Sequence, residues 1–97
     1  MMEIEQAVKE QLQQVIDPET GVDVMRMRLI EDLDVDGETG RVSYRFRPSS
    51  PLCPLAVHLA LSIRDAVGSV PGVTDQAIEV VGYVGAEDLN ALLRESS

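Results

Sequence analysis

Residues 29–46 decide the fold, and they read LIEDLDVDGETGRVSYRF. Apolar and charged side chains alternate on both sides of the cluster DGETG at 36–40, whose residue types are typical of a tight turn. Alternation with a period of two residues indicates a half-buried β-strand. The sequence therefore predicts a β-hairpin whose strands run from Leu29 to Asp36 and from Val42 to Phe46.

A helical pattern precedes this hairpin. Apolar residues recur at helical spacing over residues 3–16, and Glu5 and Lys9 form an i,i+4 pair on the other side, so the segment predicts an amphipathic helix. Pro18 disfavours the helical conformation of the residue before it. We therefore expect the helix to end at Asp17.

Three further elements are expected after the hairpin. Residues 55–70 are apolar around most of a helical circumference, residues 77–84 are rich in β-branched side chains, and residues 87–94 carry leucines at helical spacing. The order αββαβα predicts an α+β fold, a two-layer domain in which helices pack on a small three-stranded sheet. With no linker or repeat, residues 1–97 read as a single domain.

The composition excludes several classes of partner. Seventeen acidic against eight basic residues give a net charge of -9, which repels phosphate backbones and anionic lipids, so we expect no nucleic-acid and no membrane partner. No apolar run reaches membrane-spanning length and the start, MMEIE, lacks the features of a signal peptide, so we expect a cytoplasmic protein. The single cysteine, Cys53, excludes an internal disulfide and a four-cysteine metal site within one chain.

Cys53 is the first candidate for chemistry. It lies in the loop SSPLCP at 49–54, directly before the helix expected over 55–70. The positive end of the helix dipole favours a thiolate at that position, and a thiolate can bind metal or attack an electrophile. A lone cysteine is also often a small buried apolar residue. Residue type alone leaves both roles open.

Two other positions carry candidate side chains. Asp17 and Glu19 lie on the turn DPETG, where two carboxylates can hold a proton or ligate a metal, although forming the turn is the commoner role of Asp-Pro. His58 is the only histidine. It is either a base for Cys53 or a solvent-facing residue in one polar stripe of its helix, together with Ser62 and Asp65.

The run Asp32, Asp34, Asp36 and Gly37 resembles the opening of a calcium-binding loop. Such a loop needs a bidentate glutamate at its twelfth position, and Ser43 stands there instead. The apolar residues between the acids fit strand alternation. We therefore interpret the run as a solvated acidic strand and expect no calcium site.

The order of these motifs is more specific than any one of them. DPE at 17–19 is followed by a hairpin, by SSPLCP at 49–54, by an apolar helix and by VPGV at 70–73. From about residue 3 to residue 84 the chain resembles the SufT/PaaD-like metal-sulfur cluster assembly family, also called the iron-sulfur cluster assembly (FSCA) domain family.

The resemblance implies that Cys53 is the functional thiol and that the turn with Asp17 and Glu19 lies near it, with Ser50 and His58 as further supporting residues. It implies an accessory scaffold or adaptor, not an enzyme, that binds iron or an iron-sulfur cluster transiently. Its partners would be the assembly machinery and client apoproteins. The alternatives are a small accessory subunit of a phenylacetyl-CoA-type oxygenase, and a thiol enzyme with Cys53 as nucleophile.

The resemblance also bears on the backbone before the hairpin. Met25 and Met27 share the alternation of the first strand, whereas the family implies a helical turn around residues 22–27, so we expect the strand only from Leu29. Relatives usually have glycine where this chain has Arg28. The backbone at Arg28 is therefore expected to differ, or its side chain to line the site.

We also expect a homodimer. The helix over residues 54–70 has too narrow a polar stripe for a fully exposed surface. A cluster needs about four ligands, so one cysteine per chain requires a second copy, a partner or a small thiol.

Overall fold

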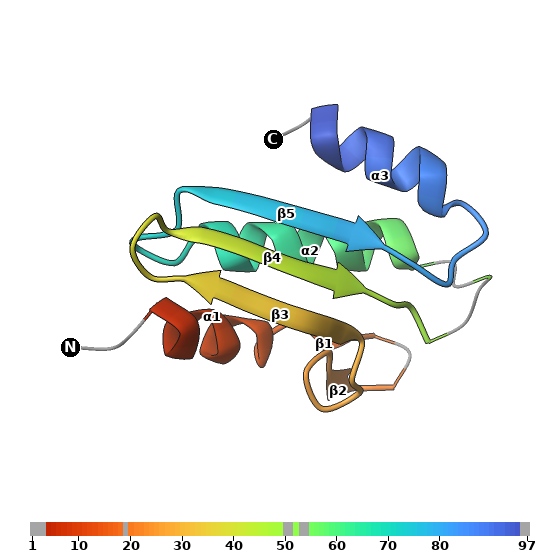
Figure 1. Cartoon of the computed structure of the whole chain (residues 1–97). Coiled ribbons are helices and arrows are strands. Elements are labelled where there is room, and N and C mark those ends of the chain that lie inside the picture. Colours follow the sequence, from red (N-terminus) through yellow and green to blue (C-terminus); the bar gives the residue numbers. More distant parts are fainter. Residues whose placement is uncertain (1–3, 19, 50–51, 53–54, 96–97) are drawn as a thin grey trace.

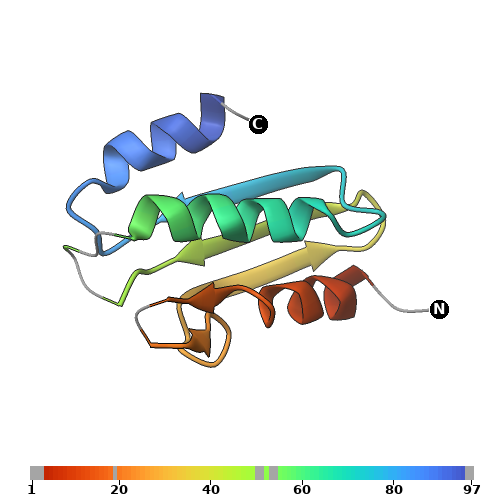
Figure 2. The same ribbon diagram turned by 180° about the vertical axis from the view of Figure 1, so that it is seen from behind.

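The computed structural model describes residues 4–18, 20–49, 52 and 55–95. The elements in chain order are α1 (Ile4–Leu12), β1 (Ile16–Asp17), β2 (Val22–Asp23), β3 (Ile30–Asp36), β4 (Arg41–Phe46), α2 (Ala56–Gly68), β5 (Asp75–Val80) and α3 (Ala86–Glu95). A three-stranded sheet has the order β3-β4-β5, and β1 and β2 form a separate two-stranded ladder. α1 and α2 cover one face of the larger sheet, and α3 lies beyond the edge that β5 forms (Figures 1 and 2). The predicted α+β class is confirmed.

The hairpin of β3 and β4 is antiparallel, as predicted, and pairs Asp36 with Arg41 across the turn. Its regular register is interrupted between Glu31 and Asp34. Asp32 has a φ of 53°, in the left-handed region, which aspartate tolerates better than most residues. The interruption is a β-bulge, so the strand contains one more residue than strict alternation predicts.

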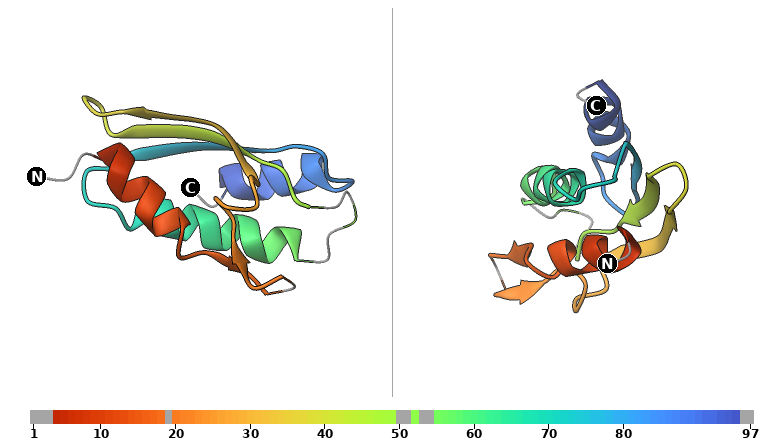
Figure 3. Two further views of the ribbon diagram at one scale, coloured as in Figure 1. Left: turned by 90° about the horizontal axis from the view of Figure 1, so that it is seen from below. Right: turned by 90° about the vertical axis from the view of Figure 1, so that its left-hand side faces the viewer.

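The strand β5 runs parallel to β4, with Ile78 opposite Tyr44, and α2 makes the crossover between them. Helices and sheet therefore form two layers (Figure 3). The core between them is almost entirely aliphatic, and Tyr44 and Phe46 are its only buried aromatic residues in the described part of the chain. The phenol of Tyr44 donates a hydrogen bond to Gln76 Oε1 at 3.0 Å, while Gln76 Nε2 donates to the Arg64 carbonyl at 2.9 Å, which ties α2 to the sheet.

The opposite face of the sheet is charged. Arg41 on β4 lies 3.8 Å from Asp75 on β5, and Arg45 lies 3.5 Å from Asp32 and 3.1 Å from Glu79. All these side chains are more than half exposed, so each pair contributes little stability. Their effect is that acidic and basic side chains alternate across this solvent-exposed face, so like charges are not neighbours.

The first helix is shorter than predicted. It ends at Leu12, not near residue 16, because Ile16 and Asp17 pair as an extended strand with Asp23 and Val22. Pro18 favours this extended conformation of Asp17. Pro18 therefore follows the end of a strand. The helical periodicity of the preceding residues did not predict the short β1–β2 ladder.

The segment before β3 follows the family's pattern rather than the alternation of its methionines. The Met27 N–H donates to the Asp23 carbonyl at 3.1 Å and the Arg28 N–H donates to the Met25 carbonyl at 3.1 Å, which makes a helical turn. β3 begins only at Ile30. The helical turn that the resemblance implied is therefore confirmed, and Met25 and Met27 pack partly against the core from it.

The third strand lies earlier than predicted, over 75–80 instead of 77–84. The Val81 N–H still donates to the Phe46 carbonyl at 3.0 Å, but Gly82 then adopts a φ of 65° and turns the chain away. Helices α2 and α3 agree with the predicted segments to within two residues at each end. No helix in the described residues is long and apolar enough to cross a membrane.

Candidate functional site

The two described candidate site residues, Asp17 and His58, belong to segments at one end of the molecule. The carboxyl ends of the parallel strands β4 and β5, the first turn of α2 and the β1–β2 hairpin all lie at this end, on the right of Figure 1. We call it the hairpin end. Ligands of open α/β sheets commonly bind beyond the carboxyl ends of parallel strands, so the position suits a functional site.

Asp17 is the most unusual residue at the hairpin end. It is 1% exposed and is the only charged side chain that is buried in the described part of the chain. Its backbone carbonyl accepts hydrogen bonds from the Gly21 N–H at 2.7 Å and the Thr20 N–H at 3.3 Å. The predicted tight turn is therefore confirmed. These two turn hydrogen bonds use the backbone carbonyl of Asp17, and its carboxylate is buried as well.

Three of the predicted site residues, Cys53, Glu19 and Ser50, lie outside the described residues. The described neighbours of Cys53 differ in burial: Leu52 is 75% exposed, whereas Leu55 packs partly against the core. Leu55 is also the N-cap of α2 and provides no side-chain hydrogen bond there. The N-cap side chain of α2 therefore accepts no hydrogen bond from the first N–H groups of the helix. These N–H groups and the positive end of the helix dipole favour an anion nearby.

His58 lies exposed in the first turn of α2, and Asp65 is exposed further along the same helix. Ser62 between them is half-buried. The predicted solvent-facing stripe is therefore confirmed for His58 and Asp65, and Ser62 faces solvent only in part. The position of His58 relative to Cys53 stays untested.

The acidic run 32–36 is part of the β3–β4 hairpin, not of the β1–β2 hairpin that names the hairpin end. Asp36 Oδ1 accepts backbone hydrogen bonds from Glu38 at 2.9 Å and Thr39 at 3.3 Å, and these bonds lower the pKa of the Asp36 carboxyl. Asp32 lies beside Arg45 on the charged face of the sheet. Among the described residues, no group of three or more histidine, cysteine, aspartate or glutamate side chains is placed to hold a metal ion.

The backbone at Arg28 fits the glycine that the resemblance implies at this position. Arg28 has a φ of 61°, in the left-handed region that glycine adopts without strain. Its side chain is exposed. Arg28 therefore adopts the left-handed backbone conformation that glycine would adopt. The strain of this conformation is offset by the stability of the rest of the fold.

The segments at the hairpin end also carry most of the exposed large apolar residues. Five large apolar residues are exposed in the described part of the chain, and four of them belong to segments at this end: Ile16 on β1, Leu52, Val57 in the first turn of α2, and Val84 after β5. Single exposed apolar residues are normal on protein surfaces. Their location on segments at one end favours a surface that another protein covers.

The sequence matches the family described as iron-sulfur cluster assembly protein over residues 5–80. An uncharacterised protein of Methanocaldococcus jannaschii is 36% identical over 84 residues, which cover 87% of each chain. The Fe-S protein maturation auxiliary factor YitW of Bacillus subtilis is 35% identical over 82 residues, which cover 80% of this chain and 79% of that factor. The iron-sulfur cluster carrier protein of Deinococcus radiodurans is 35% identical, but the match covers only 23% of its length.

The fold has counterparts among solved structures. A domain of unknown function from Bacillus anthracis superimposes with a TM-score of 0.72 at 25% identity, over 96% of this chain and 90% of that one. A conserved hypothetical protein from Thermotoga maritima superimposes with a TM-score of 0.66 at 26% identity, over 95% and 91% of the two chains. The sequence match spans α1 to β5 and includes both the Asp17 turn and Cys53. This chain belongs to the iron-sulfur cluster assembly protein family.

Proposed function

We propose that this protein is an accessory scaffold or adaptor in iron-sulfur cluster assembly or delivery, and that the Cys53 thiolate transiently holds iron or one corner of a cluster. Family membership supports the process. The names of the relatives, a maturation auxiliary factor and a cluster carrier, support a carrier rather than a catalyst. The observation that carries the proposal is the buried Asp17 carboxylate at the end of the sheet where β4 stops and α2 begins.

The Asp17 carboxylate has a defined part in this proposal. Buried charges in proteins are paired or contribute to a site, because an isolated charge in the interior is costly. At the hairpin end it either orients the groups around Cys53 or supplies an oxygen ligand to iron. The β1–β2 ladder holds it rigidly, since Asp17 pairs with Val22 and its carbonyl closes the turn.

One cysteine is too few for a complete cluster, which is held by about four protein or small-molecule ligands. A second protein or a small thiol must therefore contribute ligands during transfer, and we propose a second protein. The exposed apolar residues Ile16, Val57 and Val84 at the hairpin end suit such an encounter, because covering them with a partner removes apolar surface from water. The partner in this proposal is a client apoprotein or a second copy of this chain.

Anaerobic reconstitution with iron and sulfide tests the proposal directly. The wild-type protein should develop the visible absorption of a thiolate-bound cluster, and Cys53→Ala should not. The matched control is the double variant Cys53→Ala, Ser62→Cys, which restores one thiol on the polar stripe of α2. It should remain colourless, because the proposal requires a thiol at position 53 and not simply a thiol.

A functional assay complements the spectrum. In cells that lack the native protein, Cys53→Ala should fail to restore the activity of an iron-sulfur client enzyme. Its melting temperature should stay near that of the wild type, because deleting one sulfur costs about 1 kcal/mol or less in a small cavity. Full activity of Cys53→Ala would refute the carrier mechanism, and unfolding would show that the thiol is part of the core.

A further inference from the structure

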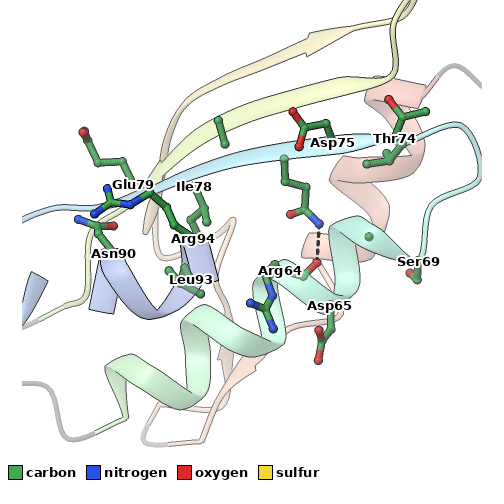
Figure 4. Close-up of a pocket in the computed structure, with 14 residues that line it drawn as sticks. Arg64, Asp65, Ser69, Thr74, Asp75, Ile78, Glu79, Asn90, Leu93 and Arg94 are labelled. Carbon is green, nitrogen blue, oxygen red and sulfur yellow. Dashed lines mark hydrogen bonds between the residues drawn. The ribbon is translucent and has the colours of Figure 1, made fainter. Parts of the chain in front are cut away.

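The edge strand β5 lies in a groove that the proposed cluster chemistry does not use. A cavity of about 920 Å³ runs between α2, β5 and α3, and neither Asp17 nor His58 lines it (Figure 4). Its walls come from the second half of α2, from residues 73–79 and from the last turns of α3. This volume is within the range of roughly 300–1,000 Å³ that is typical of ligand clefts.

The backbone of β5 is open along this groove. In a parallel ladder alternate residues bond to the neighbouring strand. The Val81 N–H donates to Phe46 on β4, so the backbone groups of Val80, Ile78 and Gln76 point away from β4, toward the groove. Within the described part of the chain, no hydrogen bond is found to these outward groups of Gln76 or Ile78. They are a free template for an added strand.

The outward groups of Val80 show how this edge binds an amide. Asn90 on α3 accepts a hydrogen bond from the Val80 N–H at 2.7 Å and donates one to the Val80 carbonyl at 3.1 Å. One side-chain amide thus reproduces the pair of bonds that a residue of a neighbouring strand would make. α3 closes the edge at Val80 in this way and leaves it open at Ile78 and Gln76.

The two sides of the groove favour different side chains on an added strand. Asp75 and Glu79 lie on the charged face of the sheet, and Figure 4 shows both pointing away from the helices. Their side chains are 62% and 57% exposed. Basic residues four positions apart would lie beside them. On the other face, Leu93 and the half-buried Ile78 favour apolar residues, and Arg64 and Arg94 on the helical walls disfavour basic ones.

A second copy of this chain fits the edge poorly. Antiparallel pairing of two β5 strands uses the outward groups of both Gln76 and Ile78 only when it is centred on Ala77. That register places Asp75 of each strand opposite Glu79 of the other, twice, and directly opposed like charges are destabilising.

We propose that the open edge of β5 binds an extended segment of a partner protein, with basic residues at positions i and i+4 and apolar residues at i+1 and i+3. The added strand pairs with Gln76 and Ile78, its basic side chains lie beside Asp75 and Glu79, and its apolar side chains enter the groove. This is β-strand addition at a sheet edge. The site is independent of Cys53 and does not require the proposed cluster chemistry.

The probe is the peptide acetyl-Lys-Val-Thr-Val-Lys-amide, titrated into ¹⁵N-labelled protein and followed by NMR. The amide signals of Gln76 and Ile78 should shift and their hydrogen exchange should slow. Binding in about the millimolar range is expected, because a short free peptide loses much conformational entropy on ordering. The control peptide with glutamate in place of both lysines should bind about fivefold more weakly or worse.

Two protein variants make the test independent of the peptide design. Ile78→Pro removes the outward N–H and should abolish binding. An edge strand tolerates proline at such a position, because the missing N–H is not bonded to the neighbouring strand. Asp75→Asn with Glu79→Gln removes both charges but only weak surface ion pairs, and should weaken binding of the lysine peptide about threefold or more. If Ile78→Pro fails to fold, this double variant decides.

Three results would overturn the proposal. The first is that neither peptide shifts Gln76 or Ile78 at concentrations up to about 10 mM, well above the range expected for a short peptide. The second is equal binding of both peptides, or unchanged binding by the double variant. The third is protection of the Ile78 amide that rises with protein concentration when no peptide is present, which would identify a second copy as the occupant.

Discussion

Two turns of this protein have nearly identical sequences. Residues 17–21 read DPETG and residues 36–40 read DGETG. In both, the final glycine N–H donates to the carbonyl of the leading aspartate, at 2.7 Å and 2.8 Å. In both, that glycine is left-handed, with φ of 71° and 80°. The shared letters therefore specify the same backbone turn.

The two leading aspartates nevertheless have different environments. The Asp36 carboxylate is fully exposed and caps its own turn by accepting two backbone N–H groups. In the first turn Pro18 follows the aspartate, the Thr20 N–H donates to the Asp17 carbonyl oxygen, and the carboxylate is buried. The motif determines the turn, and packing determines what the carboxylate does. Burial, not the motif, is what distinguishes Asp17 as a candidate site residue.

The largest difference between the two turns should appear when each glycine is replaced by alanine. A Cβ on Gly40 would overlap the Gly72 carbonyl oxygen and approach Thr74 at 3.1 Å, whereas a Cβ on Gly21 meets no atom within 4 Å. Gly21→Ala should cost about 1 kcal/mol for the left-handed backbone alone. Gly40→Ala adds the overlap and should cost about 3 kcal/mol.

Urea unfolding of the two variants measures this difference. The turn at Gly40 cannot move aside easily, because the Gly40 carbonyl accepts the Thr74 N–H at 2.9 Å and the Thr39 carbonyl accepts the Thr74 hydroxyl at 2.6 Å. Equal losses in the two variants would show that backbone conformation sets the cost in both turns. The contact between the hairpin and the start of β5 would then be looser than described.

These turns also show which parts of the fold were accessible from sequence. The turn residues and the alternation over 29–46 predicted the β3–β4 hairpin, because both signals are local. The β1–β2 ladder was missed because Ile16 also fits the helical pattern that precedes it, and only pairing with Asp23 decides between the two. The parallel pairing of β5 with β4 depends on contacts far apart in sequence, so no local pattern specifies it.

The candidate site was predictable only in part. Residue type and position identified Asp17, but its burial comes from packing between elements that the sequence does not place. The left-handed φ of Arg28 had an indirect signal, since the family's glycine at that position indicates an unusual backbone. Asn90 had none, because an asparagine within a helix is ordinarily a solvent-facing residue and only the tertiary structure brings it to Val80.

The second prediction separates the two aspartates by function. Asp17→Asn should lower the rate of cluster transfer to a client about tenfold, because groups that orient or supplement a metal ligand typically contribute tenfold to a hundredfold. Asp36→Asn should leave that rate unchanged, since among the described residues its carboxylate accepts hydrogen bonds only from its own turn. Melting temperatures of both variants show whether stability changes account for the result. Equal rates would remove Asp17 from the proposed site.

Arg28 is a third left-handed position, and unlike Gly21 and Gly40 it is not a glycine. Arg28→Gly should raise the free energy of unfolding by about 0.5 kcal/mol, since relief of the left-handed strain slightly exceeds the entropy cost of glycine. The matched control is Arg26→Gly in the same turn, where φ is not positive. It should instead lower stability by about 0.5–1 kcal/mol. Denaturant unfolding of both variants decides, and a stability loss in both would mean that the Arg28 side chain makes the larger contribution.

The smallest expected effect concerns acid stability and depends on Asp36. Hydrogen bonds from the Glu38 and Thr39 N–H groups hold the pKa of this carboxyl below its usual value of 3.8 in the folded protein. A lowered folded pKa means that the ionised form stabilises the fold. That contribution is complete above the unfolded pKa, near 4, and is lost as the pH falls through the folded pKa.

Asp36→Asn should therefore melt slightly below the wild type at pH 7, and the gap should narrow as the pH falls below about 4. Asparagine can accept the same two backbone bonds but without a charge, so the remaining difference between the proteins reports the charge alone. Asp34→Asn is the matched control, since Asp34 lies on the same strand without capping a turn. A gap that is constant from pH 7 to pH 3 would show that the carboxylate charge does not stabilise the turn. The Asp36 turn would then be held by its backbone and its glycine, without a contribution from the charge.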